Sequence, residues 1–308
     1  MKTRIIQDQP AHAAVIEVCE LTKHYGPVRA VDRLSFAVGE GVVAGFLGPN
    51  GSGKTTTLRS VLGLVEPTSG HAVIAGLPYR RLRDPLREVG AMLEPAAHPG
   101  RTARDHLRMV AAEARMPRSR ADELLNLVDL RAAAGRRVGG YSLGMHQRLG
   151  LAAALIGDPR ILVLDEPANG LDPEGIRWLR DFLRALAAEG RTVLLSSHVL
   201  SEVAQTVDEV IVINDGRLVV QAPLDRVIGS GRRIRVRSPR PAELAAALRA
   251  DGLRAVQDDT GTLTVSGAAQ ETVGQLAFDR GFPIYEISAE SAGLEETFLS
   301  LTAKEART

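Results

Sequence analysis

The sequence predicts an α/β fold built around a largely parallel sheet, followed by a smaller α+β domain. First, the glycine-rich stretch GPNGSGKTTT (48–57) lies between an apolar, strand-like run and a helical run. Second, short β-branched runs alternate with helical segments, which is typical of strands buried on both faces of a parallel sheet. Third, a different pattern begins near residue 229. A chain of 308 residues is long enough for two domains.

The first domain is expected over residues 15–228, after a polar leader at 1–14. Its predicted strands are residues 15–21, 42–48, 71–76, 88–93, 160–166, 192–197 and 209–215. The run 54–65 predicts a helix that ends before Pro67. Two stretches with helical spacing within 101–138 predict a helical insertion between strands, in a subdomain spanning about 95–150.

Residues 229–308 are expected to form the smaller domain. The patterns predict strands and helices in the order βαββαβ, which is ferredoxin-like, and then a last helix at 293–302. In RRIRVR the arginines alternate with Ile234 and Val236, so we interpret it as a strand with one solvated face. A specific anion site on that face is the alternative. The role of this domain stays open between regulation and dimerisation.

Composition excludes several classes of protein. The formal net charge is +1, from 38 basic and 37 acidic residues, which does not indicate a general nucleic-acid binder. One cysteine cannot form an internal disulfide. The N-terminus lacks the apolar core of a signal peptide, and the longest near-apolar run, 149–157, is about half a membrane span. We therefore expect a soluble cytoplasmic protein, with any membrane role supplied by a partner.

The stretch GPNGSGKTTT satisfies the phosphate-loop spacing G-x-x-x-x-G-K-[ST]. It does so directly after a strand and at the start of a helix. Glycines let consecutive backbone N–H groups turn toward one anion, and the helix N-terminus adds partial positive charge. Lys54 then reaches the outer phosphates, and the Thr55 hydroxyl can ligate Mg²⁺. The predicted phosphate-binding residues are Gly48, Pro49, Asn50, Gly51, Ser52, Gly53, Lys54, Thr55 and Thr56.

Two carboxylates, Asp165 and Glu166, end the apolar run ILVLDE. The first suits a Mg²⁺ contact, and the second can deprotonate a water that attacks a γ-phosphate. Acidic pairs at strand ends are common. This pair indicates a catalytic site because it lies downstream of a phosphate loop.

The segment YSLGMHQRLG (141–150) predicts a second place that can hold an anion. Ser142 is a good helix N-cap, and Gly144 allows close backbone approach. The alternative is that Ser142 caps its own helix and does nothing more.

Taken together, GPNGSGKTT, YSLGMHQR, ILVLDEPANGLDP and SSH resemble a nucleotide-binding subunit of the ATP-binding cassette (ABC) family over residues 15–225. The resemblance implies a P-loop NTPase fold with the ABC-type helical insertion, and hydrolysis of ATP with Mg²⁺. YSLGM resembles the family signature LSGGQ, with Leu143 and Met145 as departures around Ser142 and Gly144. The resemblance further implies that two copies meet head to tail. The signature of one copy then closes on the ATP bound to the other.

Four more residues are carried over by position in the family motifs. Tyr25 matches the aromatic that stacks on adenine, and His198 matches the histidine that contacts the γ-phosphate, with Lys54 and Glu166 as its catalytic companions. Asp172 matches the loop at the dimer interface and also suits a helix cap. Glu94 stands where the family usually has a Gln that ligates Mg²⁺, and a carboxylate can also ligate Mg²⁺ with an added negative charge. The resemblance thus implies Thr55, Glu94 and Asp165 as Mg²⁺ ligands.

The stretches AMLEPAAHPGRTARDHL, YSLGM and LEETFLSLT resemble bacterial exporters of the bacitracin and lantibiotic self-protection type. That resemblance implies a separate membrane-spanning permease, a second copy of the chain, and a location at the inner face of the membrane. An importer ATPase would more often carry a C-terminal β-barrel. The alternatives are a soluble cassette protein acting on ribosomes or DNA, and a nucleotide-binding regulator without turnover. The exported substrate stays open among a drug, a peptide antibiotic and a lipid.

Overall fold

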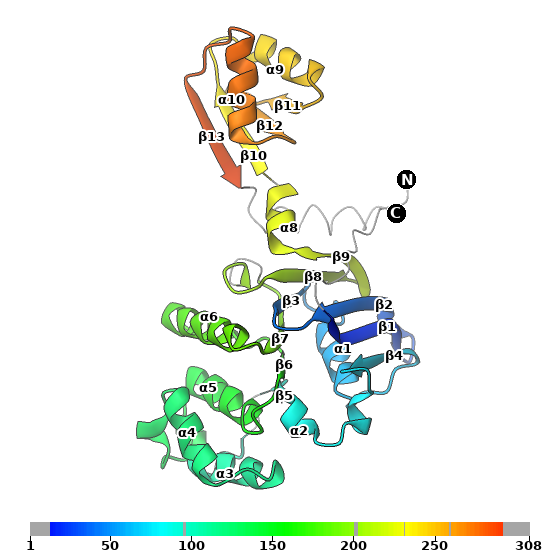
Figure 1. Ribbon diagram of the computed structural model, residues 1–308, viewed down its shortest axis with the longest axis vertical. Helices are drawn as coiled ribbons and strands as arrows, with labels where there is room; N and C mark the ends of the chain where they lie inside the picture. The colour runs from blue at the N-terminus through cyan, green and yellow to red at the C-terminus, as the bar shows by residue number, and fades with distance from the viewer. Residues whose placement is uncertain (1–12, 95–96, 200–202, 231, 259, 292–308) are drawn as a thin grey trace. The chain divides into compact units, whose positions relative to one another are not determined.

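The computed structural model describes residues 13–94, 97–199, 203–230, 232–258 and 260–291 (Figure 1). It divides into two compact units, Met1–Ala222 and Pro223–Thr308. The sequence places the boundary after residue 228, whereas the structure divides before helix α8 (Leu224–Ser230). The predicted helix at 293–302 and most of the predicted leader lie outside the described residues.

The first unit contains a six-stranded sheet with the order β5-β6-β7-β3-β8-β9. Its strands are β3 (Val43–Leu47), β5 (Val89–Met92), β6 (Ile161–Leu164), β7 (Thr192–Ser197), β8 (Glu209–Asn214) and β9 (Arg217–Pro223). The five from β5 to β8 pair in parallel, and every residue of β3, β6 and β7 is buried. Their near-continuous apolar sequences are therefore explained by burial on both faces.

A second, antiparallel sheet in the same unit has the order β2-β1-β4. It consists of β1 (Ala14–Tyr25), β2 (Val28–Gly39) and β4 (Ser69–Ile74). Buried side chains from both sheets and from α1 (Lys54–Val61) form one core, which includes Leu34, Phe46 and Leu58. Through Leu58 and Val61, this core packs α1 against the strands of both sheets.

Sequence analysis missed β2 and β9 and made the first helix too long. Strand β2 was missed because Arg29, Asp32 and Arg33 interrupt its apolar pattern. The helix predicted to reach residue 65 ends at Val61, because Gly63 adopts φ +66°, a left-handed conformation that stops an α-helix.

The helical insertion is made of α3 (Ala103–Glu113), α4 (Ser119–Leu127) and α5 (Leu143–Ala154). Two of the 3₁₀ turns, at Arg131–Ala133 and Val138–Gly140, lie between α4 and α5. A third 3₁₀ turn (Tyr79–Arg81) and the short helix α2 (Pro85–Glu88) lie between β4 and β5. Fully buried leucines at each helix, such as Leu107, Leu124 and Leu149, show why the three helices pack together. Helix α6 (Pro173–Ala188) follows β6 and packs against β7.

Within its described residues, the second unit has six elements after α8, in the βαββαβ order expected from the sequence. They are β10 (Arg232–Arg237), α9 (Pro241–Ala250), β11 (Arg254–Gln257), β12 (Leu263–Ser266), α10 (Gln270–Asp279) and β13 (Glu286–Ser291). The strands form an antiparallel sheet in the order β11-β12-β10-β13. Ile234 and Val236 are buried while Arg235 and Arg237 are exposed, so β10 is a strand with one apolar and one solvated face.

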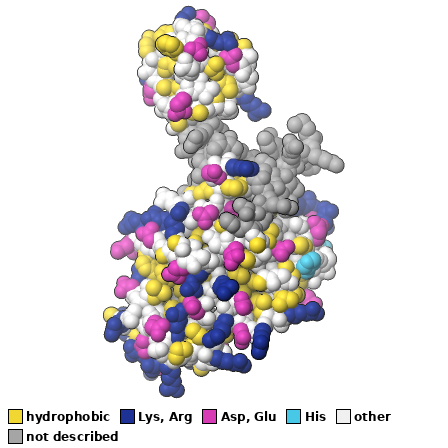
Figure 2. Space-filling view, in the orientation of Figure 1, with side chains coloured by type: hydrophobic (Ala, Val, Ile, Leu, Met, Phe, Trp, Pro, Cys, Tyr) yellow, Lys and Arg dark blue, Asp and Glu magenta, His cyan; other side chains and the backbone are white. Residues whose placement is uncertain are grey.

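Acidic and basic side chains are interspersed over the visible face of the first unit (Figure 2), in keeping with the balanced formal charge. Within the described residues, no helix has both the length and the apolar character needed to cross a membrane.

Candidate functional site

The phosphate loop joins the end of β3 to the start of α1. Gly51 and Gly53 adopt φ +81° and +100°, which other residues rarely do. A Cβ at Gly48 would lie 2.6 Å from the carbonyl oxygen of Ile213, and one at Gly53 would lie 2.3 Å from that of Ala30. The loop is therefore packed tightly from both sides at Gly48 and Gly53, where a side chain has no space. It leads into the N-terminus of α1, where the helix dipole favours an anion.

A cavity of about 440 Å³ lies over this loop, a volume typical of small-molecule sites. It is lined by Ala30, Asn50, Gly51, Gly53, Lys54, Thr55, Thr56, Glu166, Asn169 and His198. The Lys54 ammonium donates to the carbonyl oxygens of Gly48, at 2.8 Å, and Pro49, at 3.2 Å. Six of the nine predicted phosphate-binding residues and all three predicted catalytic residues, Lys54, Glu166 and His198, are thus brought together. Ala30 and Asn169 were not predicted.

The two carboxylates after β6 have different partners. Asp165 accepts a hydrogen bond from the Thr55 hydroxyl at 2.7 Å, and it also accepts one from the Ser196 hydroxyl. Ser196 in turn accepts a hydrogen bond from the Glu166 backbone N–H at 2.9 Å, and Glu166 adopts φ +48°. Ser196 therefore ties both acidic residues to β7. Sequence reasoning missed it, although a polar residue within the apolar run TVLLSS was a visible signal.

Glu166 lies between two nitrogen groups at the wall of the cavity. One of its oxygens is 3.4 Å from Lys54 Nζ, and the other is 2.8 Å from His198 Nδ1. The side chain is 24% exposed, so water reaches it. A carboxylate held in this way can accept a proton from a water molecule in the cavity.

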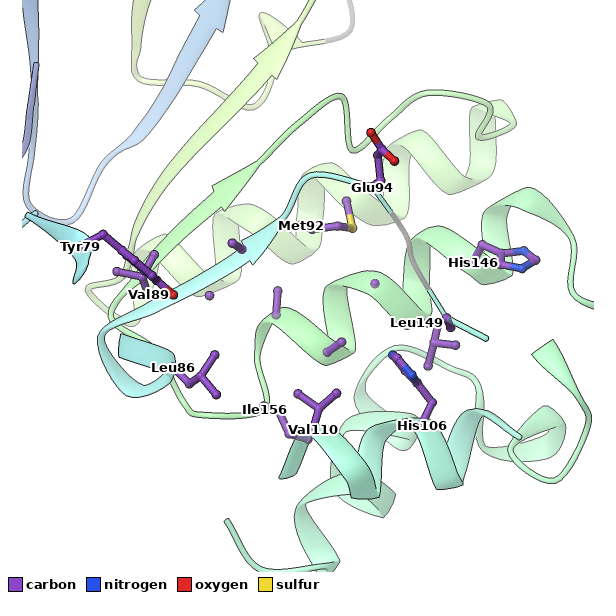
Figure 3. Close-up of a pocket in the computed structure, with 16 residues that line it drawn as sticks. Tyr79, Leu86, Val89, Met92, Glu94, His106, Val110, His146, Leu149 and Ile156 are labelled. Carbon is purple, nitrogen blue, oxygen red and sulfur yellow. The ribbon is translucent and has the colours of Figure 1, made fainter. Parts of the chain in front are cut away.

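Tyr25 and Glu94, predicted to contact the adenine and Mg²⁺, do not line this cavity. Tyr25 lies at the end of β1, is half-exposed, and has the Lys23 ammonium over its ring at 5.1 Å. Glu94 is 76% exposed and forms an ion pair with Arg59 at 2.9 Å. It lines a separate cavity between β5, α3 and α5 (Figure 3). Neither residue contacts the phosphate loop through an interaction that the structure records among its described residues.

The predicted signature residues begin α5 and also lie outside the phosphate-loop cavity. Ser142 caps the helix by accepting from the Met145 N–H at 3.3 Å, and Leu143 is half-exposed. A Cβ on Gly144 would meet Leu171 at 3.4 Å, so α5 begins against the loop that precedes α6. Asp172 caps α6 by accepting from the Gly175 N–H at 2.7 Å. Both Ser142 and Asp172 are therefore helix caps in this chain.

The oxygens of Thr55 and Asp165 suit a hard cation such as Mg²⁺, because hydroxyl and carboxylate oxygens are its preferred protein ligands. The described residues contain no group of three or more His, Cys, Asp or Glu side chains that could hold a metal by itself. This donor set therefore fits a cation that takes its other ligands from water and a bound phosphate.

The phosphate loop, the parallel sheet and the cavity over the loop are those of a nucleotide-binding protein. A family model described as "ABC transporter" matches residues 31–169, and one described as a domain of unknown function (DUF8746) matches 232–295. The bacitracin transport ATP-binding protein BcrA of Bacillus licheniformis is 42% identical over 225 residues, covering 72% of this chain and 74% of that protein. The lantibiotic transport ATP-binding protein SrtF of Streptococcus pyogenes is 37% identical over 212 residues, covering 68% and 92%.

Similarity also extends over nearly the whole chain. The uncharacterized ABC transporter ATP-binding protein YhcH of Bacillus subtilis (strain 168) is 35% identical over 297 residues, covering 94% of this chain and 96% of that protein. A solved structure of an ATP-binding subunit of an ABC transporter aligns with a TM-score of 0.63 and 27% identity, over 69% of this chain and 91% of that one. The chain belongs to the family of ABC transporter ATP-binding proteins, which hydrolyse ATP. The family resemblance found in the sequence is confirmed.

Proposed function

We propose that this chain is the ATP-hydrolysing subunit of an exporter that moves a drug, a peptide antibiotic or a lipid through a separate membrane-spanning permease. The observation that carries the hydrolytic part is Glu166, whose carboxylate lies between Lys54 and His198 at the wall of the phosphate-loop cavity. The relatives named for bacitracin and lantibiotic transport support the exporter part.

In this proposal the triphosphate of ATP lies along the phosphate loop, with Lys54 neutralising its outer phosphates. Glu166 accepts the proton of the water that attacks the γ-phosphate. His198 orients the Glu166 carboxylate through its Nδ1 contact, and Ser196 holds the backbone of the same residue. Thr55 and Asp165 would hold Mg²⁺, which supplies charge neutralisation on the phosphates when it is bound.

We propose that two copies act together. Ser142, Leu143, Gly144 and Met145 resemble the family signature but do not line the phosphate-loop cavity of their own chain. In a head-to-tail pair they would close on the nucleotide of the other copy, and Asp172 would lie at the interface. Tyr25 would stack on the adenine of the nucleotide held by its own chain.

The permease would dock at the cavity of about 240 Å³ between β5, α3 and α5 (Figure 3). This contact would place the chain at the inner face of the membrane. Its lining is mainly apolar and includes Met92, Val110 and Leu149. Glu94 lies at the same cavity and belongs to the segment that follows β5, which supports a role in relaying closure to the partner.

The Glu166→Gln variant tests the hydrolytic proposal. It keeps the size of the side chain and removes the base, so ATP hydrolysis should fall by about 10²–10⁴-fold while ATP binding is retained. In ATP and Mg²⁺ at micromolar protein the variant should sediment as a dimer. Glu189→Gln, an exposed acid at the end of α6, is the control and should hydrolyse ATP normally. A Glu166→Gln protein that stays monomeric would contradict the shared-site proposal.

Purification of the tagged chain from membranes in mild detergent tests the exporter proposal. A multi-span protein should co-purify in stoichiometric amount. Recovery with ribosomes or nucleic acid instead would contradict the exporter and leave the ATPase chemistry in place.

A further inference from the structure

We propose that Asp32 is a positioning residue for ATP. It holds β2 against the phosphate loop through an ion pair with Arg217 of β9, and so it acts on nucleotide affinity without touching the nucleotide.

The first observation is a close packing of β2 on the phosphate loop. Ala30 lines the nucleotide cavity. A Cβ added to Gly53 would lie only 2.3 Å from the carbonyl oxygen of Ala30. A shift of this strand therefore changes both the wall of the cavity and the space in which Gly53 holds its φ of +100°.

The second observation is that the turn between β8 and β9 ties these two segments together. The Gly216 N–H donates to the carbonyl oxygen of Ser52 at 3.0 Å, and the Asp32 N–H donates to that of Gly216 at 2.9 Å. Gly216 adopts φ +76°, and a Cβ there would lie 2.9 Å from the carbonyl oxygen of Ala30. The phosphate loop, β2 and the turn thus meet with no space for a side chain between them.

The third observation is a buried ion pair beside the place where the phosphate loop, β2 and the turn meet. Asp32 is only 5% exposed, and its carboxylate accepts from Arg217 Nε at 2.7 Å and from Arg29 Nη1 at 2.9 Å. Burial alone would raise the pKa of Asp32, but the hydrogen bonds from Arg217 and Arg29 outweigh it and the pKa lies below its usual value. The carboxylate therefore stays charged, and both strands are held to one buried anion. A buried charge that loses its partner is costly, so this contact resists opening.

The test measures kcat and KM for ATP in the full-length chain, together with equilibrium ATP binding and the thermal midpoint without nucleotide. Asp32→Asn keeps the shape and removes the charge. We expect KM and Kd to rise about tenfold, which corresponds to about 1.4 kcal/mol, while kcat stays within about twofold. Arg217→Gln should reproduce this effect. The double variant should be no worse than either single one, because both changes break the same contact.

Two variants make the result decisive. Arg33→Gln is the matched control, since Arg33 is 71% exposed and approaches Asp32 only to 3.7 Å; its KM should equal that of the unmodified protein. Arg217→Lys keeps the charge but loses the two-pronged contact, and its KM should be intermediate. An unchanged KM in Asp32→Asn, whatever its thermal midpoint, would overturn the proposal and leave Asp32 as a purely structural residue. If Asp32→Asn does not fold, an unchanged KM in Arg217→Lys would overturn it equally.

Discussion

Ser196→Ala should weaken both the fold and the hydrolysis of ATP. The Ser196 hydroxyl is fully buried, donates to the Asp165 carboxylate, and accepts from the Glu166 N–H. A hydrogen bond to a charged group contributes about 1.5–3 kcal/mol and a neutral one about 0.5–1.5, so the free energy of unfolding should fall by roughly 2–4 kcal/mol. Glu166 also loses the bond that supports its φ of +48°, a conformation that costs about 1–3 kcal/mol. A kcat about 10–100-fold lower would follow from a shift of this carboxylate.

The assay pairs urea unfolding with steady-state phosphate release at saturating ATP. Thr192→Val is the matched control. Thr192 is fully buried at the start of the same strand, and its hydroxyl accepts from the Gly41 N–H at 2.9 Å, far along β7 from the carboxylates. It should lose about 1 kcal/mol of stability and keep its kcat. If Ser196→Ala loses stability but hydrolyses ATP like this control, Ser196 does not position Glu166.

Four further variants test other features of the structure. Burial, and then the charge of Asp208, raise the pKa of Glu209 to about 7. The free energy of unfolding should therefore fall as pH rises from about 4.5 to 7. Glu209→Gln should remove up to about 3 kcal/mol of that fall, as measured by urea unfolding at several pH values. Glu94→Gln should keep basal ATPase activity and alter only its stimulation by the permease; loss of basal activity would refute this. Gly53→Ala should abolish ATP binding in a filter assay, whereas Gly51→Ala, with open space around its Cβ, should only weaken it; equal effects would argue against the close packing at Gly53.

Several elements were predictable because their signal is local. A parallel strand that is buried on both faces is mostly apolar, so β6, β7 and β8 stand out in the sequence. The phosphate loop is visible because its geometry requires glycine at particular positions. Strand β2 is different, since its charged residues Arg29 and Asp32 find their partners within the strand and on β9, far along the chain.

The residues of the candidate site likewise include some that the sequence predicts and one that it does not. Lys54, Asp165, Glu166 and His198 follow the carboxyl ends of neighbouring parallel strands or begin the helix after one, and the topology brings such residues to one edge of the sheet. Ser196 has no sequence motif of its own. Its importance arises from two hydrogen bonds that exist only when β6 and β7 pair.

By itself, then, the order of motifs along the chain determined the fold class, the phosphate loop and the acidic pair, because each depends on residue type within a few positions. Only the tertiary structure decided which side chains complete the site. Asp32 and Arg217 meet across 185 positions of sequence, and Glu94 pairs with Arg59 rather than lining the nucleotide cavity. Contacts of this kind depend on how separate strands and helices pack, and no local pattern encodes them.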